Sequence, residues 1–164
     1  MIRIQNVLVA TDFSEASEAA LTYGRELART FNGTLHVLHV VDSVYSQYLG
    51  EAYTPILPEV QRDVEQAGHR QLERVLEDED RTMLHVKPVV HVAVNKAAAI
   101  VDYAGRNAID IIVIGTHGRG AISHLLMGSV AERVVRTAAC PVLTVHHPEH
   151  EFVVPDALAI VTHA

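Results

Sequence analysis

The sequence has a single cysteine, no tryptophan and only two lysines, Lys87 and Lys96, among its 164 residues. One cysteine cannot form an internal disulfide, and we interpret Cys140 as a small buried residue. The formal net charge is -7. Nucleic acids and anionic membranes are usually met by a clustered basic surface. We therefore expect neither of them as a partner.

Long apolar runs are also absent. No run reaches the roughly 18 apolar residues of a membrane span, and Asp12 and Glu15 interrupt the apolar segment that begins at Val7. A secretory leader would need a longer uninterrupted segment, so we expect a cytoplasmic protein. The hydrophobic content of 49% is enough for the core of one domain.

Short β-branched runs alternate with longer helical patterns, which is typical of a parallel sheet covered by helices. The predicted strands are 6–11, 35–41, 84–91, 111–115 and 142–146. The predicted helices begin near Ser14 and Val60 and span about 96–107 and 129–137. Five strands and four helices favour a single-domain α/β fold, Rossmann-like and doubly wound. In such folds ligands bind beyond the carboxyl ends of the strands.

Three stretches lie outside this alternation. Residues 77–80, all acidic, are interpreted as the solvated end of the second helix. Residues 42–58 form a long connection with three tyrosines, which is typical of a lid, an interface or a disordered loop. The tail 148–164 carries an apolar segment, and we treat it as a candidate interface element.

A glycine-rich segment follows the fourth strand, with glycines at 115, 118, 120 and 128 and with Ser129 at a predicted helix start. Glycines between a buried strand and a helix start are typical of a phosphate cradle. A P-loop needs a lysine directly after its last glycine, and neither lysine lies here. A dinucleotide fingerprint would follow the first strand and need a third glycine where Ser123 stands. Both interpretations are therefore disfavoured.

The spacing Gly115-x-x-Gly118, nine residues, Gly128-Ser129 strongly resembles the universal stress protein family, in its nucleotide-binding branch. The resemblance runs from Val9-Ala10-Thr11-Asp12-Phe13-Ser14 to Cys140-Pro141-Val142-Leu143. It implies a nucleotide-binding domain over 1–147 and strand order 3-2-1-4-5. It also implies a homodimer through the last strand, and bound ATP or AMP, with Mg²⁺ as a candidate companion of ATP.

The same resemblance implies a set of residues around the nucleotide. Asp12 would lie against the adenosine, Val41 would meet the adenine through its main chain, and Ser129 would donate to a phosphate. Where related chains commonly have proline after the first strand, this one has Ala10. The full set is Ala10, Thr11, Asp12, Val41, Gly115, Thr116, His117, Gly118, Arg119, Gly128, Ser129 and Val130. We assign no catalytic and no metal-binding residue.

Plainer roles stay open at several of these positions. Asp12 and Ser129 are each also suited to cap a helix without any ligand. His146 and His147 point to opposite faces of an extended segment and so converge poorly on one metal. His36 and His39 are interpreted as solvated or hydrogen-bonded.

The sequence thus favours an adenine-nucleotide-binding protein of a stress response or of regulation, in which binding matters more than turnover. Two alternatives remain. One is a slow ATP hydrolase in which Asp12 or His117 positions water. The other is an interaction module with the same fold and no nucleotide.

Overall fold

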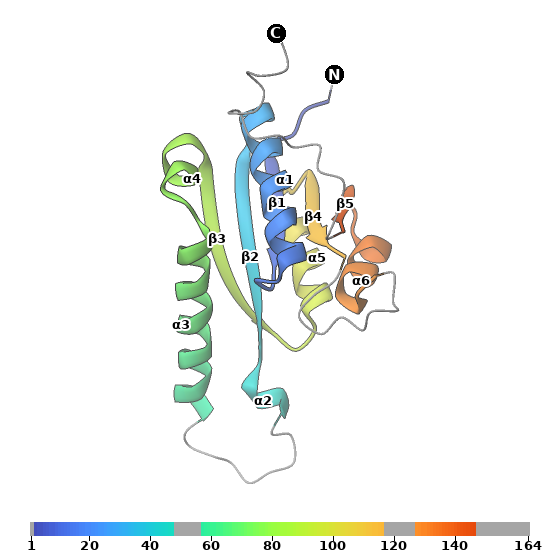
Figure 1. Cartoon of the computed structure of the whole chain (residues 1–164). Coiled ribbons are helices and arrows are strands. Elements are labelled where there is room, and N and C mark those ends of the chain that lie inside the picture. Colours follow the sequence, from blue (N-terminus) through green and yellow to red (C-terminus); the bar gives the residue numbers. More distant parts are fainter. Residues whose placement is uncertain (1, 48–56, 117–126, 147–164) are drawn as a thin grey trace.

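The computed structural model describes residues 2–47, 57–116 and 127–146. Its centre is a parallel five-stranded sheet in the order β3-β2-β1-β4-β5, which confirms the predicted fold class and strand order (Figure 1). The strands are β1 (Asn6–Thr11), β2 (Thr34–Asp42), β3 (His85–Ala93), β4 (Ile111–Gly115) and β5 (Val142–Val145).

Six helices lie in the described part of the chain. They are α1 (Glu15–Phe31), α2 (Val44–Gln47), α3 (Leu57–Val75), α4 (Asp78–Met83), α5 (Lys96–Arg106) and α6 (Ser129–Thr137). The short helices α2 and α4 are additional to the four predicted ones. None of these helices has the length and the apolar character that crossing a membrane requires.

The two faces of the sheet are covered by different helices, because successive residues of a strand point to opposite sides. Val7 and Val9 of β1 are fully buried in a cluster with residues of α1 and α3. Leu8 and Ala10 pack into a second cluster with α5 and α6. Cys140 lies at the edge of the second cluster, and burial raises the pKa of its thiol. The result is a three-layer α/β/α sandwich.

Helix α1 begins where the sequence predicts it. Ser14 is its N-cap, with an extended backbone and a side chain that accepts from the main-chain N–H of Ser17. Glu15 and Glu18 lie in the first turn, where the helix dipole favours negative charge. Asn32 ends the helix in the left-handed conformation at φ 51°.

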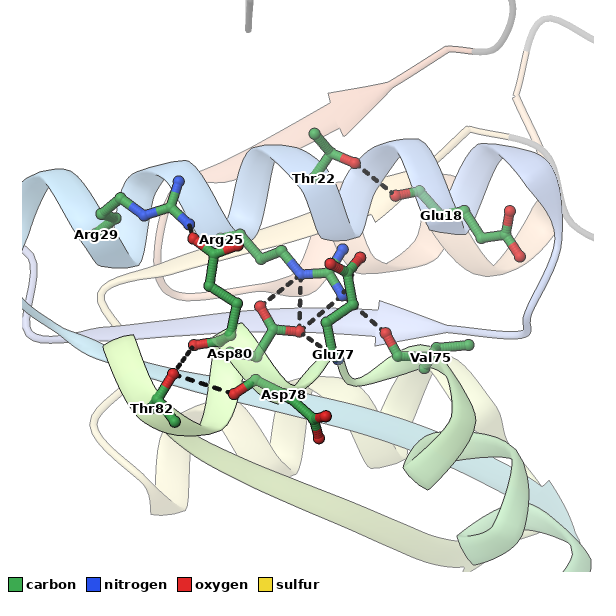
Figure 2. Close-up of polar contacts among 10 residues, drawn as sticks. Glu18, Thr22, Arg25, Arg29, Val75, Glu77, Asp78, Asp80 and Thr82 are labelled. Atoms are coloured by element: carbon green, nitrogen blue, oxygen red, sulfur yellow. Dashed lines mark hydrogen bonds and ion pairs between the residues drawn. The ribbon is translucent and has the colours of Figure 1, made fainter. Parts of the chain in front are cut away.

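A buried ion pair joins α1 to α4 near the amino ends of the strands (Figure 2). Arg25 donates to the Asp80 carboxylate from Nε to Oδ1 at 2.8 Å and from Nη2 to Oδ2 at 2.8 Å. Arg25 Nη2 also donates to the main-chain oxygen of Val75, the last residue of α3, at 2.7 Å. We call these three residues the Arg25 clamp.

The interpretation of 77–80 as a solvated helix end is confirmed in part: residues 77–79 are exposed, but Asp80 is buried and the run does not end α3. Glu77 is instead the N-cap of a separate helix, α4, and Asp80 accepts from its main-chain N–H at 3.0 Å. Asp80 is only 3% exposed. Its charge is tolerated there because Arg25 and the Glu77 amide satisfy it.

Candidate functional site

The carboxyl ends of β1 and β4 meet at one edge of the sheet. The two strands are parallel neighbours, and their last paired residues are Ala10 and Ile114. Thr11 and Gly115 each follow one residue later and are buried. The two segments that the sequence analysis singles out, 10–12 and 115–116, therefore lie side by side, although about a hundred residues separate them in the chain.

Gly115 lies in direct contact with the first turn of α1. A Cβ atom at this position would lie 2.7 Å from the main-chain carbon of Ala16 and 2.8 Å from its oxygen. Such distances are far inside van der Waals contact. Only glycine lets the first turn of α1 pack against the end of β4 here.

The turn between β1 and α1 is built from its own hydroxyl and carboxylate groups. Asp12 Oδ1 accepts from the main-chain N–H of Ser14 at 3.1 Å and also from its hydroxyl. Thr11 Oγ1 accepts from the main-chain N–H of Phe13 at 3.0 Å and lies 3.1 Å from Ser17 Oγ. Asp12 thus braces the turn, whereas the helix itself is capped by Ser14.

The described ends of the glycine-rich segment are also joined. Thr116 donates its main-chain N–H to Val145 at 2.7 Å, and its main-chain oxygen accepts from Gly128. Thr116 Oγ1 lies 3.1 Å from His146 Nδ1. The candidate residues His117, Gly118 and Arg119 lie outside the described residues.

Among the described residues, no side chain caps the start of α6. Its N-cap is Gly128, which carries no side-chain oxygen, and Ser129 is the first helical residue with an exposed side chain. Ser129 therefore does not cap the helix, which corrects one of the alternatives. The first-turn amides of a helix carry partial positive charge and suit an anion. Val130 packs partly into the core beside them.

Val41 lies at the end of β2, on the far side of β1 from β4. Its side chain belongs to the core and is 5% exposed. Pairing of β2 with β1 ends at His39, while pairing with β3 continues to Asp42. The main chain at Val41 therefore extends past the end of β1, and on that side no described strand pairs with it.

Two residues at this edge carry interactions that sequence reasoning did not assign. His39 Nδ1 lies 2.8 Å from the main-chain oxygen of Thr11, so the expectation of a hydrogen-bonded His39 is confirmed. Phe13 has φ 61° and packs its ring on the imidazole, with centroids 4.4 Å apart. The alternation of β2 places His39 on the same face as Val41. No sequence pattern indicates that His39 contacts Thr11 or that Phe13 has a left-handed φ.

Comparison with known proteins agrees with this geometry. The sequence profile of the universal stress protein family matches residues 3–146. Universal stress protein MJ0531 of Methanocaldococcus jannaschii is 30% identical over 150 residues, which are 90% of this chain and 85% of that protein.

Solved structures of similar fold agree as well. The structure of MJ0577, from the same organism, has a TM-score of 0.74 at 25% identity and covers 91% of this chain and 100% of its own. The universal stress protein from Archaeoglobus fulgidus in complex with dAMP has a TM-score of 0.56 at 22% identity, with 88% and 99% covered. The chain described here belongs to the universal stress protein family.

Proposed function

We propose that this protein binds an adenine nucleotide, ATP or AMP, at the carboxyl edge of β1 and β4, and that it acts as a cytoplasmic regulator in a stress response. The observation that carries the proposal is the contact of Gly115 with Ala16. It packs the first turn of α1, which follows the carboxylate-bearing turn, against the residue at which the glycine-rich segment starts. A polar turn and an anion-binding segment can then address the two ends of one ligand.

The two ends of the site suit different parts of a nucleotide. The first turn of α6, where the N-cap Gly128 has no side chain and Ser129 is the first helical residue, suits the phosphates. The turn at Asp12 and the main chain at Val41 suit the ribose and the base. That a relative of the same fold has been solved in complex with dAMP is in line with an adenine ligand.

Binding, not turnover, is the role proposed. Asp12 is the carboxylate of the turn after β1, where its Oδ1 accepts two hydrogen bonds from Ser14. A general base or a water-positioning group needs a carboxylate oxygen at the reacting water beside the phosphates. In the proposal Asp12 lies instead at the adenosine end, and no residue has a catalytic role.

Calorimetric titration with ATP, AMP and adenosine tests the proposal, with ATP titrated both with and without Mg²⁺. The variant Gly128→Val should abolish binding of all phosphate-bearing ligands. Its fold should persist, because φ -70° and ψ 149° at this position suit any residue. Wild-type protein that gives no heat with ATP or AMP would overturn the proposal.

A milder variant locates the phosphates. Ser129→Ala should weaken the binding of AMP and ATP by about tenfold, which corresponds to one hydrogen bond to a charged group. The affinity for adenosine should stay unchanged. Thr137→Ala, at the other end of the same helix, is the matched control, because its hydroxyl bonds only to Arg133 within the helix. An equal loss of affinity for adenosine would mean that Ser129 does not bind the phosphates.

We propose in addition that two copies pair through β5. In the described part of the chain this strand pairs with β4 alone, and Val142 and Leu143 remain partly exposed. An unprotected strand edge is a template for pairing with another chain. Sedimentation equilibrium should give twice the chain mass, and a monomer at micromolar concentration would overturn the pairing.

A further inference from the structure

His39 links β2 to the last residue of β1. It stands directly opposite Thr11 in the strand pairing, one position beyond the last pair of β1 with β4. Its Nδ1 lies 2.8 Å from the main-chain oxygen of Thr11. A carbonyl oxygen only accepts, so Nδ1 carries the hydrogen. A side chain of β2 therefore holds the carbonyl from which the β1–α1 turn departs.

Two neighbours fix the position of the imidazole. The ring of Phe13 lies against it with centroids 4.4 Å apart and the planes inclined by 44°. On α3, a Cβ atom at Gly68 would come within 3.2 Å of His39 Cδ2 and of Val41 Cγ1. Glycine at this buried helix position leaves the room that the ring occupies.

The turn that His39 holds is strained. Phe13 adopts φ 61°, a left-handed conformation that costs a residue with a Cβ about 1–2 kcal/mol. Asp12 precedes it and Ser14 follows it, so the left-handed residue decides where the Asp12 carboxylate lies. Such conformations persist only where the surroundings over-determine them, and they cluster at functional sites.

We propose that His39 is a positioning residue of the nucleotide site. By donating to Thr11 and packing on Phe13, it keeps the strained turn in the conformation that presents Asp12 to the ligand. The inference rests on the proposed adenine-nucleotide binding and adds to it a residue that contacts the turn and not the ligand. Because Asp12 is assigned to the adenosine end, ATP, AMP and adenosine should all depend on His39 to the same degree.

Two variants separate the hydrogen bond from the ring. His39→Asn keeps an amide N–H near the place of Nδ1 but loses the ring, whereas His39→Phe keeps a ring but loses the donor. We expect His39→Phe to weaken AMP and adenosine binding by about tenfold, which corresponds to one lost hydrogen bond. His39→Asn should stay within about threefold of the wild type. The melting temperatures should rank the other way, with His39→Phe the more stable of the two.

The opposite rankings of the two variants in affinity and in melting temperature distinguish a positioning role from a packing role. If His39 only filled space, His39→Asn would be both the less stable variant and the weaker binder, and that result would overturn the inference. His39→Phe binding like the wild type would overturn it as well. His36→Asn is the control on the same strand, because His36 faces α5 and should leave AMP affinity unchanged. A wild type that binds neither AMP nor adenosine would instead refute the proposed function, and the positioning role with it.

Discussion

At the amino edge of the sheet, α1 and α4 are held together by a guanidinium and a carboxylate, Arg25 and Asp80. At the carboxyl edge, the β1–α1 turn is held by local hydrogen bonds among Thr11, Asp12, Ser14 and Ser17, and by the imidazole of His39. In the Arg25 clamp the guanidinium and the carboxylate are paired within the protein. Both edges carry left-handed residues, Asn32 and Ala108 at the first and Phe13 at the second, but the second also carries the start of α6, whose N-cap is a glycine.

The two edges differ in what they offer to a ligand. A buried ion pair with all its groups satisfied fixes one arrangement of helices and offers little to a ligand. The start of α6 has a glycine as its N-cap, and a bound anion can stabilise the amides of its first turn. Under the proposed function, stability and binding lie at opposite ends of the same strands.

Breaking the Arg25 clamp should give the largest loss of stability. Arg25→Met leaves the buried Asp80 carboxylate without its cation and removes the donor to Val75. We expect the free energy of unfolding to fall by about 3–5 kcal/mol in urea titrations. AMP affinity, measured at 10 °C with the variant still folded, should stay within about twofold of the wild type.

Two further variants sharpen this test. Asp80→Asn added to Arg25→Met removes the unpaired charge while the amide oxygen can still accept from Glu77, so part of the stability should return. Arg136→Met breaks an exposed pair with Glu132 and should cost below about 0.5 kcal/mol. If the Arg25 and Arg136 variants lose equal stability, the clamp does not hold the amino edge.

At the carboxyl edge, Gly115→Ala should affect stability and binding together. The new Cβ would meet the main chain of Ala16, and overpacking of this kind costs about 1–3 kcal/mol. The displaced turn carries Asp12, so AMP affinity should fall by about tenfold or more. Differential scanning calorimetry and AMP titration measure the two effects.

The matched control is Gly105→Ala in α5, where a Cβ would meet no atom within 4 Å. This variant should be about 0.5–1 kcal/mol more stable than the wild type, because alanine favours the helix, and should bind AMP normally. A Gly115→Ala protein with reduced stability but wild-type affinity would separate the fold of this edge from its proposed function.

Gly115 also shows how much of the structure can be predicted from the sequence. Its glycine identity was predicted to serve the ligand, and the structure gives it a second reason, the approach of Ala16. The sequence places the five strands to within two residues at each end, since buried parallel strands read as continuous β-branched runs. It also places the N-cap at Ser14, which is a local signal.

What could not be predicted depends on partners far away in the chain. Asp80 looks solvated until Arg25, 55 residues earlier, is brought beside it. His39 meets Thr11 across 28 residues, and the left-handed φ of Phe13 follows from that environment. The four-residue helix α2 has too few positions for a periodic pattern.

Between the two edges, the buried His36 gives the mildest test of whether the interior of the fold admits a charge. The residue is 4% exposed, its Nδ1 lies 2.8 Å from the hydroxyl of Tyr103, and Lys87 stands opposite it on β3. Burial first, and then the charge of Lys87, lower the pKa of His36 below its ordinary value. The folded protein therefore keeps this imidazole neutral at a pH where the unfolded chain protonates it.

The stability that neutral His36 provides should be fully present above about pH 6.5, the ordinary value for histidine, and should be lost as the pH falls below it. Below that pH the unfolded state binds more protons, so the free energy of unfolding decreases. We expect His36→Asn to lose less stability than the wild type between pH 7.5 and pH 5.5 in urea titrations. His85→Asn, on the exposed edge strand β3, should show the same loss as the wild type. Equal losses in all three proteins would mean that the interior admits the charge.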